Sequence, residues 1–169
     1  MEGGDALPVD RWHPEHCGKM DLVIKADGTW MHEGTPMTRA PLVRLFSRIL
    51  RRDDDGYVLV TPVEKISIEV EDVPFLAVDY DRTAEGFVFR TNVGDKVLAS
   101  PEHPVTLRMS EHLGQLAPYV LVRGRLEARL DRPAYYRLAE DLDTDEDGEA
   151  LLLPSGGATF RLPIEKRGE

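Results

Sequence analysis

Apolar residues recur at helical spacing in a segment that starts near Pro41. The apolar positions are Leu42, Leu45, Phe46 and Ile49, and the basic positions that alternate with them are Arg44, Arg48, Arg51 and Arg52. Residues three and four apart share one side of an α-helix. The pattern therefore predicts an amphipathic helix that begins at Pro41 and carries its arginines on an exposed face.

The residues after this helix follow the pattern of strands. The run "YVLVT" (57–61) is continuously apolar and β-branched, as in a buried strand, and "KISIEVE" (65–71) alternates apolar and polar residues. Only a short polar segment separates the two runs. We expect them to pair as a hairpin.

The same order of elements returns later in the chain. Residues 39–62 align without a gap on residues 131–154, at a constant offset of 131 − 39 = 92. The matching pairs include Pro41 with Pro133 at the helix starts and Gly56 with Gly148 after the acidic residues. Proline fits the first helical turn and glycine suits the position that ends a helix. We expect an internal duplication in which both helices end at an Asp-Gly.

The remaining segments read as strands and hairpins. "DLVIKADGTWMHEG" (21–34) predicts a hairpin on Asp27-Gly28, and "GFVFRTNVGDKVLAS" (86–100) predicts another with a turn at 92–95. Residues 104–109 and 118–130 are read as two further strands, and "EALLLP" (149–154) with "ATFRLPI" (158–164) repeats the strand pair of the first copy. The fold class predicted is α+β, with two related modules that each contain a curled antiparallel sheet and one helix. The boundary falls in "EDVPFLAV", which divides the chain into domains 1–75 and 76–169.

Composition narrows the classes of partner. The chain has 169 residues, 41% of them hydrophobic, and a formal net charge of -10. This charge disfavours a nucleic acid polymer or an anionic membrane, whereas a small anion needs only a few donors in one pocket. Because no signal sequence or membrane span is recognisable, we expect a cytoplasmic protein. Cys17 is the only cysteine, which excludes an internal disulfide, and the sequence leaves open whether its thiol is reactive.

Three long stretches carry a resemblance to a known family. They are residues 11–50, residues 57–75 and "PYVLVRGRLEARL" (118–130). With them the chain resembles the bacterial domain-of-unknown-function 1285 family. The resemblance implies two domains with a duplicated core and a C-terminal half superficially similar to pleckstrin-homology folds. It also implies an interdomain groove suggested to bind a nucleotide-type ligand in signal transduction, and it brings no catalytic motif.

Arginines on the last long strand are the best candidates for binding an anion. Arg123, Arg125 and Arg129 occupy alternate positions and would share one face, where guanidinium forks can hold a phosphate or carboxylate. The alternative is a solvated face whose arginines pair with Glu127 and surface acids. The turn "TPVEK" adds Thr61, Glu64 and Lys65 to the candidate ligand site because it belongs to a stretch that carries the resemblance, although an ordinary hairpin connection explains it equally well.

Two other segments contain residue types that are typical of metal sites. "DTDEDGEALLLP" (143–154) begins like a calcium loop, but its twelfth position is Pro154, so we interpret it as an acidic turn that ends a helix. "HPEHCG" places His13, His16 and Cys17 close together without a recognisable fourth ligand, which favours a packed N-terminal segment.

The function expected is non-enzymatic. It is a ligand-binding or regulatory role in which a small anion, plausibly a nucleotide, occupies the groove between the modules. No cofactor is expected, and a protein partner is also compatible with the sequence. The alternative is a metal-dependent hydrolase or phosphoesterase that would use the acidic turns and the N-terminal histidines.

Overall fold

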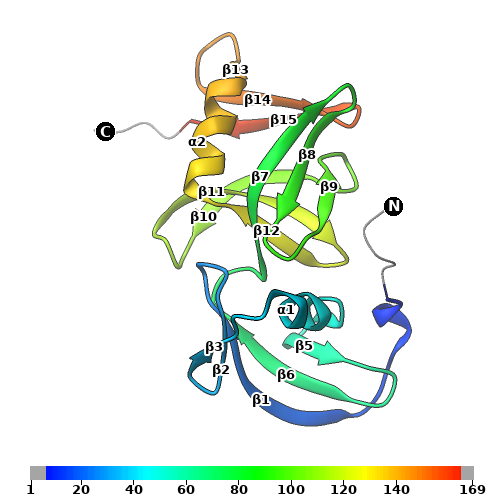
Figure 1. Ribbon diagram of the computed structural model, residues 1–169. Coiled ribbons are helices and arrows are strands. Elements are labelled where there is room, and N and C mark those ends of the chain that lie inside the picture. Colours follow the sequence, from blue (N-terminus) through cyan, green and yellow to red (C-terminus); the bar gives the residue numbers. More distant parts are fainter. Residues whose placement is uncertain (1–6, 165–169) are drawn as a thin grey trace.

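The computed structural model describes residues 7–164 and shows two lobes that lie one above the other (Figure 1). The lower lobe in Figure 1 contains a short 3-10 helix, six strands and one α-helix within the described residues. They are η1 (Val9–Arg11), β1 (His16–Ile24), β2 (Trp30–His32), β3 (Thr35–Pro36), α1 (Ala40–Ser47), β4 (Leu50–Asp53), β5 (Gly56–Val60) and β6 (Lys65–Val70). We call this lobe the N-terminal domain.

The upper lobe, the C-terminal domain, contains the other elements. They are β7 (Phe75–Thr83), β8 (Gly86–Thr91), β9 (Lys96–Leu98), β10 (Val105–Ser110), β11 (Gln115–Arg123), β12 (Leu126–Leu130), α2 (Arg132–Asp141), β13 (Asp143–Thr144), β14 (Ala150–Ser155) and β15 (Ala158–Pro163). The two domains are similar α+β units with curled sheets, and each carries one α-helix, as the sequence predicted. The boundary drawn between residues 75 and 76 falls at the start of β7.

The sheets are mixed, which corrects the expectation of purely antiparallel ones. In the N-terminal domain the strand order is β3-β2-β1-β6-β5-β4, and β1 runs parallel to β6. In the C-terminal domain the order is β10-β11-β12-β7-β8-β9, and β7 runs parallel to β12. Hairpins follow from neighbouring residues, but a parallel pair joins strands that are distant in sequence. Local pattern therefore identified the hairpins and missed both parallel pairs.

The predicted hairpins are confirmed. Ile24 pairs with Trp30 around Asp27-Gly28, and Val60 pairs with Lys65 across the β5–β6 turn. The β8–β9 and β14–β15 pairs are antiparallel as well. In both copies of the repeat the helix is followed by three strands. However, β4 to β6 join the six-stranded sheet, whereas β13 to β15 form a separate three-stranded sheet.

The Asp-Gly pairs do not end the helices, which corrects a second expectation. Helix α1 ends at Ser47 and α2 ends at Asp141, several residues before Gly56 and Gly148. Each acidic segment instead forms the turn of a hairpin, between β4 and β5 or between β13 and β14. Asp and Gly are typical of tight turns as well as helix ends, so composition alone did not separate the two. The consequence is that Arg51 and Arg52 lie on β4 and not on the exposed face of α1.

The predicted strand 118–130 is divided into two. Gly124 adopts a φ of 55°, in the region that favours glycine, and the chain turns back so that Arg123 pairs with Leu126. Two sets of side chains then cover opposite faces of the β11–β12 hairpin. Val120 and Ala128 face the core of the C-terminal domain, while the neighbouring pair, Tyr119 and Arg129, faces the N-terminal domain and is also buried.

A buried ion pair joins the two domains at this second face. Arg129 donates from Nη1 to Asp72 Oδ2 at 2.7 Å and from Nη2 to the carbonyl of Ala26 at 2.8 Å. Tyr119 donates its hydroxyl hydrogen to the same carboxylate, with O···O distances of 3.0 and 3.1 Å. The side chains of Arg129 and Asp72 are only 8% and 12% exposed. Both charges are thus removed from water and depend on each other.

We predict that Arg129→Met destabilises the protein by about 3–5 kcal/mol, because it leaves the carboxylate of Asp72 buried without a cation. Urea denaturation provides the measurement. The double variant Asp72→Asn/Arg129→Met should be less destabilised than Arg129→Met alone. Arg161→Met is the control, since Arg161 is half-exposed and pairs with Asp145 at the surface. A loss no greater than that of the control would contradict the prediction.

Candidate functional site

Two of the three arginines predicted to bind an anion hold the domains together. Arg129 is the buried partner of Asp72 described above. Arg123 donates from Nη2 to the carbonyl of Ser47 at the end of α1, at 2.9 Å, and lies 3.5 Å from a carboxylate oxygen of Asp95. Its guanidinium also lies over the ring of Phe75, 5.2 Å from the centroid. Both arginines therefore donate to an acceptor of the N-terminal domain.

The alternative partner expected for these arginines, Glu127, is occupied by a different residue. Arg108 on β10 donates to both carboxylate oxygens of Glu127 at 2.8 Å, and its guanidinium stacks 3.7 Å from the ring centroid of Tyr119. Such a two-pronged contact is geometrically specific. It explains why the pKa of Arg108 is raised. Glu127 therefore fixes Arg108 over the ring of Tyr119, and all three residues belong to the C-terminal domain.

The third arginine, Arg125, occupies the tip of the β11–β12 hairpin and reaches the N-terminal domain. Its Nη1 donates to Asp54 Oδ1 at 3.1 Å and to the carbonyl of Arg52 at 3.4 Å. The Arg125 side chain is 54% exposed and the Asp54 side chain is fully exposed. This contact is open to water, in contrast to those of Arg123 and Arg129, so it holds neither group firmly.

A cleft of ≈ 700 Å³ lies beside Arg125 and is formed by both domains. It is lined by Asp10, His13, Arg51, Arg52, Asp53, Asp54, Asp55, Lys65 and Arg125. Three segments of the N-terminal domain contribute: the residues around η1, the β4–β5 hairpin and the start of β6. This volume lies in the usual range for small-molecule sites. We call it the interdomain cleft.

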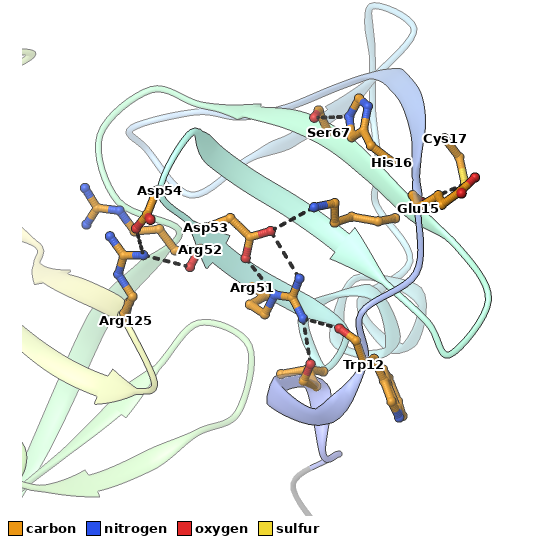
Figure 2. Close-up of polar contacts among 12 residues, drawn as sticks. Trp12, Glu15, His16, Cys17, Arg51, Arg52, Asp53, Asp54, Ser67 and Arg125 are labelled. Atoms are coloured by element: carbon orange, nitrogen blue, oxygen red, sulfur yellow. Dashed lines mark hydrogen bonds and ion pairs between the residues drawn. The ribbon is translucent and has the colours of Figure 1, made fainter.

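Arg51 lines the interdomain cleft and makes four hydrogen bonds there (Figure 2). Its Nε and Nη2 donate to the two oxygens of Asp53 at 2.7 and 3.1 Å, and its Nη1 donates to the carbonyls of Val9 and Trp12 at 2.8 and 2.7 Å. The hydrogen bond to Asp53 raises the pKa of Arg51. Because all three donor nitrogens are engaged, Arg51 fixes the N-terminal segment against β4.

Lys65 is the second cation beside Asp53. The ammonium lies 3.4 Å from Asp53 Oδ2, and the side chain is 23% exposed. The hydrogen bond from Arg51 lowers the pKa of Asp53, and Lys65 lowers it further. One carboxylate thus serves two cations of the cleft lining, so Lys65 shares its counter-ion with Arg51.

Arg52 is the most available cation of the cleft. Its guanidinium lies over the ring of Tyr57, 5.5 Å from the centroid, and it bonds to no carboxylate or carbonyl within residues 7–164. Figure 2 shows Arg52, Asp54 and Arg125 together at one end of the cleft, apart from the Arg51 and Asp53 pair. Sequence reasoning missed Arg51 and Arg52 because both were assigned to the helix. Recognition of "LRRD" as a strand before an Asp-Gly turn was the signal that could have found them.

Lys65 and Arg125 are the two predicted residues that the structure brings into the cleft. Thr61 and Glu64 lie in the β5–β6 turn, where the N–H of Thr61 donates to the carbonyl of Glu64 at 2.8 Å and the N–H of Val63 donates to Thr61 Oγ1 at 3.3 Å. They are outside the cleft lining. A role of Thr61 and Glu64 in ligand binding stays a prediction.

The segments weighed as metal sites have other contacts. Asp145, in the acidic turn, accepts hydrogen bonds from the N–H groups of Glu149 at 2.8 Å and Ala150 at 3.4 Å, and the first of these lowers its pKa. His16 Nε2 lies 2.7 Å from Ser67 Oγ, and the exposed Cys17 contacts the carbonyl of Glu15. No three His, Cys, Asp or Glu side chains between residues 7 and 164 are placed to share a metal ion.

Comparisons with known proteins identify relatives over most of the chain. Residues 7–73 match the model described as "Domain of unknown function (DUF1285), N-terminal domain", and residues 74–162 match "Protein of unknown function (DUF1285), C-terminal domain". No functionally curated protein matches the chain. In the part of the chain that the structure describes, neither helix has the length and apolar character needed to span a membrane.

Two solved structures are similar. A DUF1285 family protein from Silicibacter pomeroyi DSS-3 is 40% identical, with a TM-score of 0.87 over 96% of this chain and 90% of that one. A DUF1285 family protein from Shewanella baltica OS155 is 29% identical, with a TM-score of 0.59 over 73% of this chain and 94% of that one. The fold described above is thus shared with experimentally determined structures.

The Arg51–Asp53 contact predicts a pH dependence of stability. Because the folded pKa of Asp53 lies below its ordinary value, its contribution is complete above the unfolded pKa and is lost as the pH falls through the folded pKa. Asp53→Asn should lose about 1.5–3 kcal/mol at pH 6, the range of a hydrogen bond to a charged group. This deficit should shrink below about pH 4.

Urea denaturation of the two proteins between pH 6 and pH 3 measures this difference. Asp147→Asn is the control, because Asp147 is an exposed acid in the equivalent turn of the second repeat. Its stability should match that of the unaltered protein throughout. A deficit for Asp53→Asn that stays constant across the range would contradict the assignment.

Proposed function

The chain belongs to the DUF1285 family, and from this premise we propose that it is a non-enzymatic ligand-binding protein whose interdomain cleft takes a small anionic molecule. A nucleotide-type ligand and a role in signal transduction fit this proposal. The observation that carries it is the gathering of cations from two domains around one cleft of ≈ 700 Å³. Among them are Lys65 and Arg125, which the sequence had already singled out.

The arrangement of charges supports binding rather than mere stabilisation. Four cations and four aspartates line the cleft, and among the cations only Arg51 has every donor nitrogen engaged with protein acceptors. Lys65 shares its carboxylate with Arg51, and Arg52 has no acceptor among the described residues. The net charge of -10 repels anions at long range, so a small anion needs a local group of incompletely paired cations in order to bind.

The position of the cleft between domains supports a regulatory role. A ligand that contacts β6 of one domain and the β11–β12 tip of the other stabilises one relative placement of the domains. Binding in the cleft then affects the outer surfaces of both domains through the relative placement of the domains. A binding protein of this kind requires no catalytic group.

We predict that ligands with phosphate or carboxylate groups raise the melting temperature, and that nucleosides without phosphate do not. A ligand present at 100 times its dissociation constant adds about 2.7 kcal/mol to the free energy of unfolding. Thermal-shift measurements over a panel of nucleotides, organic phosphates and dicarboxylates provide the first test. Isothermal titration calorimetry then gives the dissociation constants.

The matched variants are Lys65→Met and Lys19→Met. Both lysines pair with one glutamate or aspartate in the same sheet, but Lys19 contacts Glu69 at 2.9 Å outside the cleft. Lys65→Met should weaken binding about tenfold, which corresponds to roughly 1.4 kcal/mol. Lys19→Met should bind like the unaltered protein. Equal affinities of the two variants, or no anion that binds, would refute the proposed function.

A further inference from the structure

The two most exposed cations of the interdomain cleft come from different domains and share one weak counter-ion. Arg52 lies on β4 and Arg125 lies at the tip of the β11–β12 hairpin, within hydrogen-bond distance of the carbonyl of Arg52. Asp54 is the one carboxylate bonded to either guanidinium within residues 7–164, through a single contact of 3.1 Å to Arg125. The two guanidinium groups therefore share one bonded carboxylate, while Asp55 also lines the cleft without a bond to either of them.

Asp54 is held loosely. Its side chain is fully exposed and that of Arg125 is 54% exposed, so solvent screens their attraction. No hydrogen bond from a described backbone N–H fixes the carboxylate, in contrast to Asp145 in the equivalent turn. Asp54 can swing into water without leaving a buried charge behind. Its carboxylate therefore occupies a position in which a ligand anion can replace it.

The charge of the incoming group decides whether it can replace Asp54. A carboxylate ligand carries one negative charge, the same as Asp54. Unlike Asp54 it is not attached to the protein, so it gains nothing over Asp54 in this exchange. A phosphate diester also carries one negative charge per phosphate. A phosphate monoester carries about 1.5 to 2 negative charges at neutral pH and three acceptor oxygens. Only the monoester adds charge and enough oxygens for two guanidinium forks.

We propose that Arg52 and Arg125 form a clamp for the terminal phosphate of a small phosphate monoester, and that the ligand displaces Asp54 from Arg125. This inference rests on the proposed function and specifies its ligand class. The ring of Tyr57 supports the clamp from the N-terminal side by holding the Arg52 guanidinium in place. The β11–β12 hairpin supports it from the C-terminal side, since Arg123 anchors that hairpin to Ser47.

Calorimetric titration at pH 7.5 and constant ionic strength tests the ligand class. Adenosine 5′-monophosphate and glycerol 1-phosphate are the monoester probes, 3′,5′-cyclic adenosine monophosphate is the diester probe, and acetate is the carboxylate probe. Both monoesters should bind at least about tenfold more tightly than the diester and acetate, because one additional charge-assisted hydrogen bond contributes about that factor or more. Diester or acetate binding of equal strength would overturn the monoester assignment.

Variants test the residues of the clamp. Arg52→Ala and Arg125→Ala should each weaken glycerol 1-phosphate binding about tenfold or more, for the same reason. Arg161→Ala is the matched control, since Arg161 is also 54% exposed and has one carboxylate partner at 3.1 Å. Asp54→Asn should tighten binding several-fold. Glu146→Gln, an exposed acid 92 positions further along the chain, removes the same charge away from the cleft and should have a smaller effect.

The outcomes separate this inference from the proposed function. If Lys65→Met weakens anion binding but Arg52→Ala and Arg125→Ala do not, the cleft binds anions and the clamp is wrong. If Asp54→Asn and Glu146→Gln have equal effects, Asp54 is not the displaced counter-ion. Tighter binding of a phosphoserine peptide than of glycerol 1-phosphate would reassign the clamp to a protein partner. If no probe binds the unaltered protein, the proposed function itself fails.

Discussion

The buried contact of Arg129 with Asp72 and the Ala26 carbonyl fixes one domain on the other. An arginine at this position can neither remain unpaired nor be hydrated, so the two domains must meet in a geometry that brings acceptors to it. Tyr119 adds its hydroxyl to the same carboxylate from the neighbouring strand. The β11–β12 hairpin is thereby held firmly at its base, and its tip is carried to the edge of the N-terminal domain, where Arg125 reaches the cleft.

Burial sorts the charged groups of the interface into two kinds. Arg129 donates to acceptors of the other domain, Arg123 donates to Ser47 of the other domain and to Asp95 of its own, and Arg51 uses its donors to hold the N-terminal segment. All of these groups have hydrogen-bond partners. If an external anion replaced those partners, buried acceptors would lose their donors, which costs free energy. Arg52, Lys65 and Arg125 are less completely paired and face the cleft. The proposed binding site thus consists of the residues that the domain interface leaves incompletely paired.

The local pattern of apolar and polar residues predicted more of the fold than of the candidate site. The hairpins at Asp27-Gly28 and between β5 and β6 follow from neighbouring residues, and the duplication follows from direct alignment. The turn at Gly124 was missed because alternation of apolar and polar residues continues across a two-residue turn as it does along one strand. The parallel pairs of β1 with β6 and β7 with β12 depend on contacts between distant segments, which no local period encodes.

The candidate site was harder to predict because contacts between the domains determine which charged residues line the cleft. Arg123, Arg125 and Arg129 look equivalent in sequence, yet depth below the surface gives each a different environment, with side-chain exposures of 28%, 54% and 8%. Arg52 was assigned to the wrong element, so its position in the cleft could not be anticipated.

The duplication shows how position in the assembly changes the use of one local structure. The β4–β5 and β13–β14 turns descend from the same segment, and both contain acids followed by glycine. Asp145 in the second turn accepts backbone hydrogen bonds and pairs with Arg161 of its own sheet, and its counterpart Asp53, 92 residues earlier, likewise pairs with Arg51 and Lys65 of its own sheet. Asp54 in the first turn instead meets Arg125 of the other domain and remains exposed. The acid at the equivalent position of each turn is thus satisfied within its own sheet, whereas Asp54 depends on a facing domain and leaves a place for which the proposed ligand can compete.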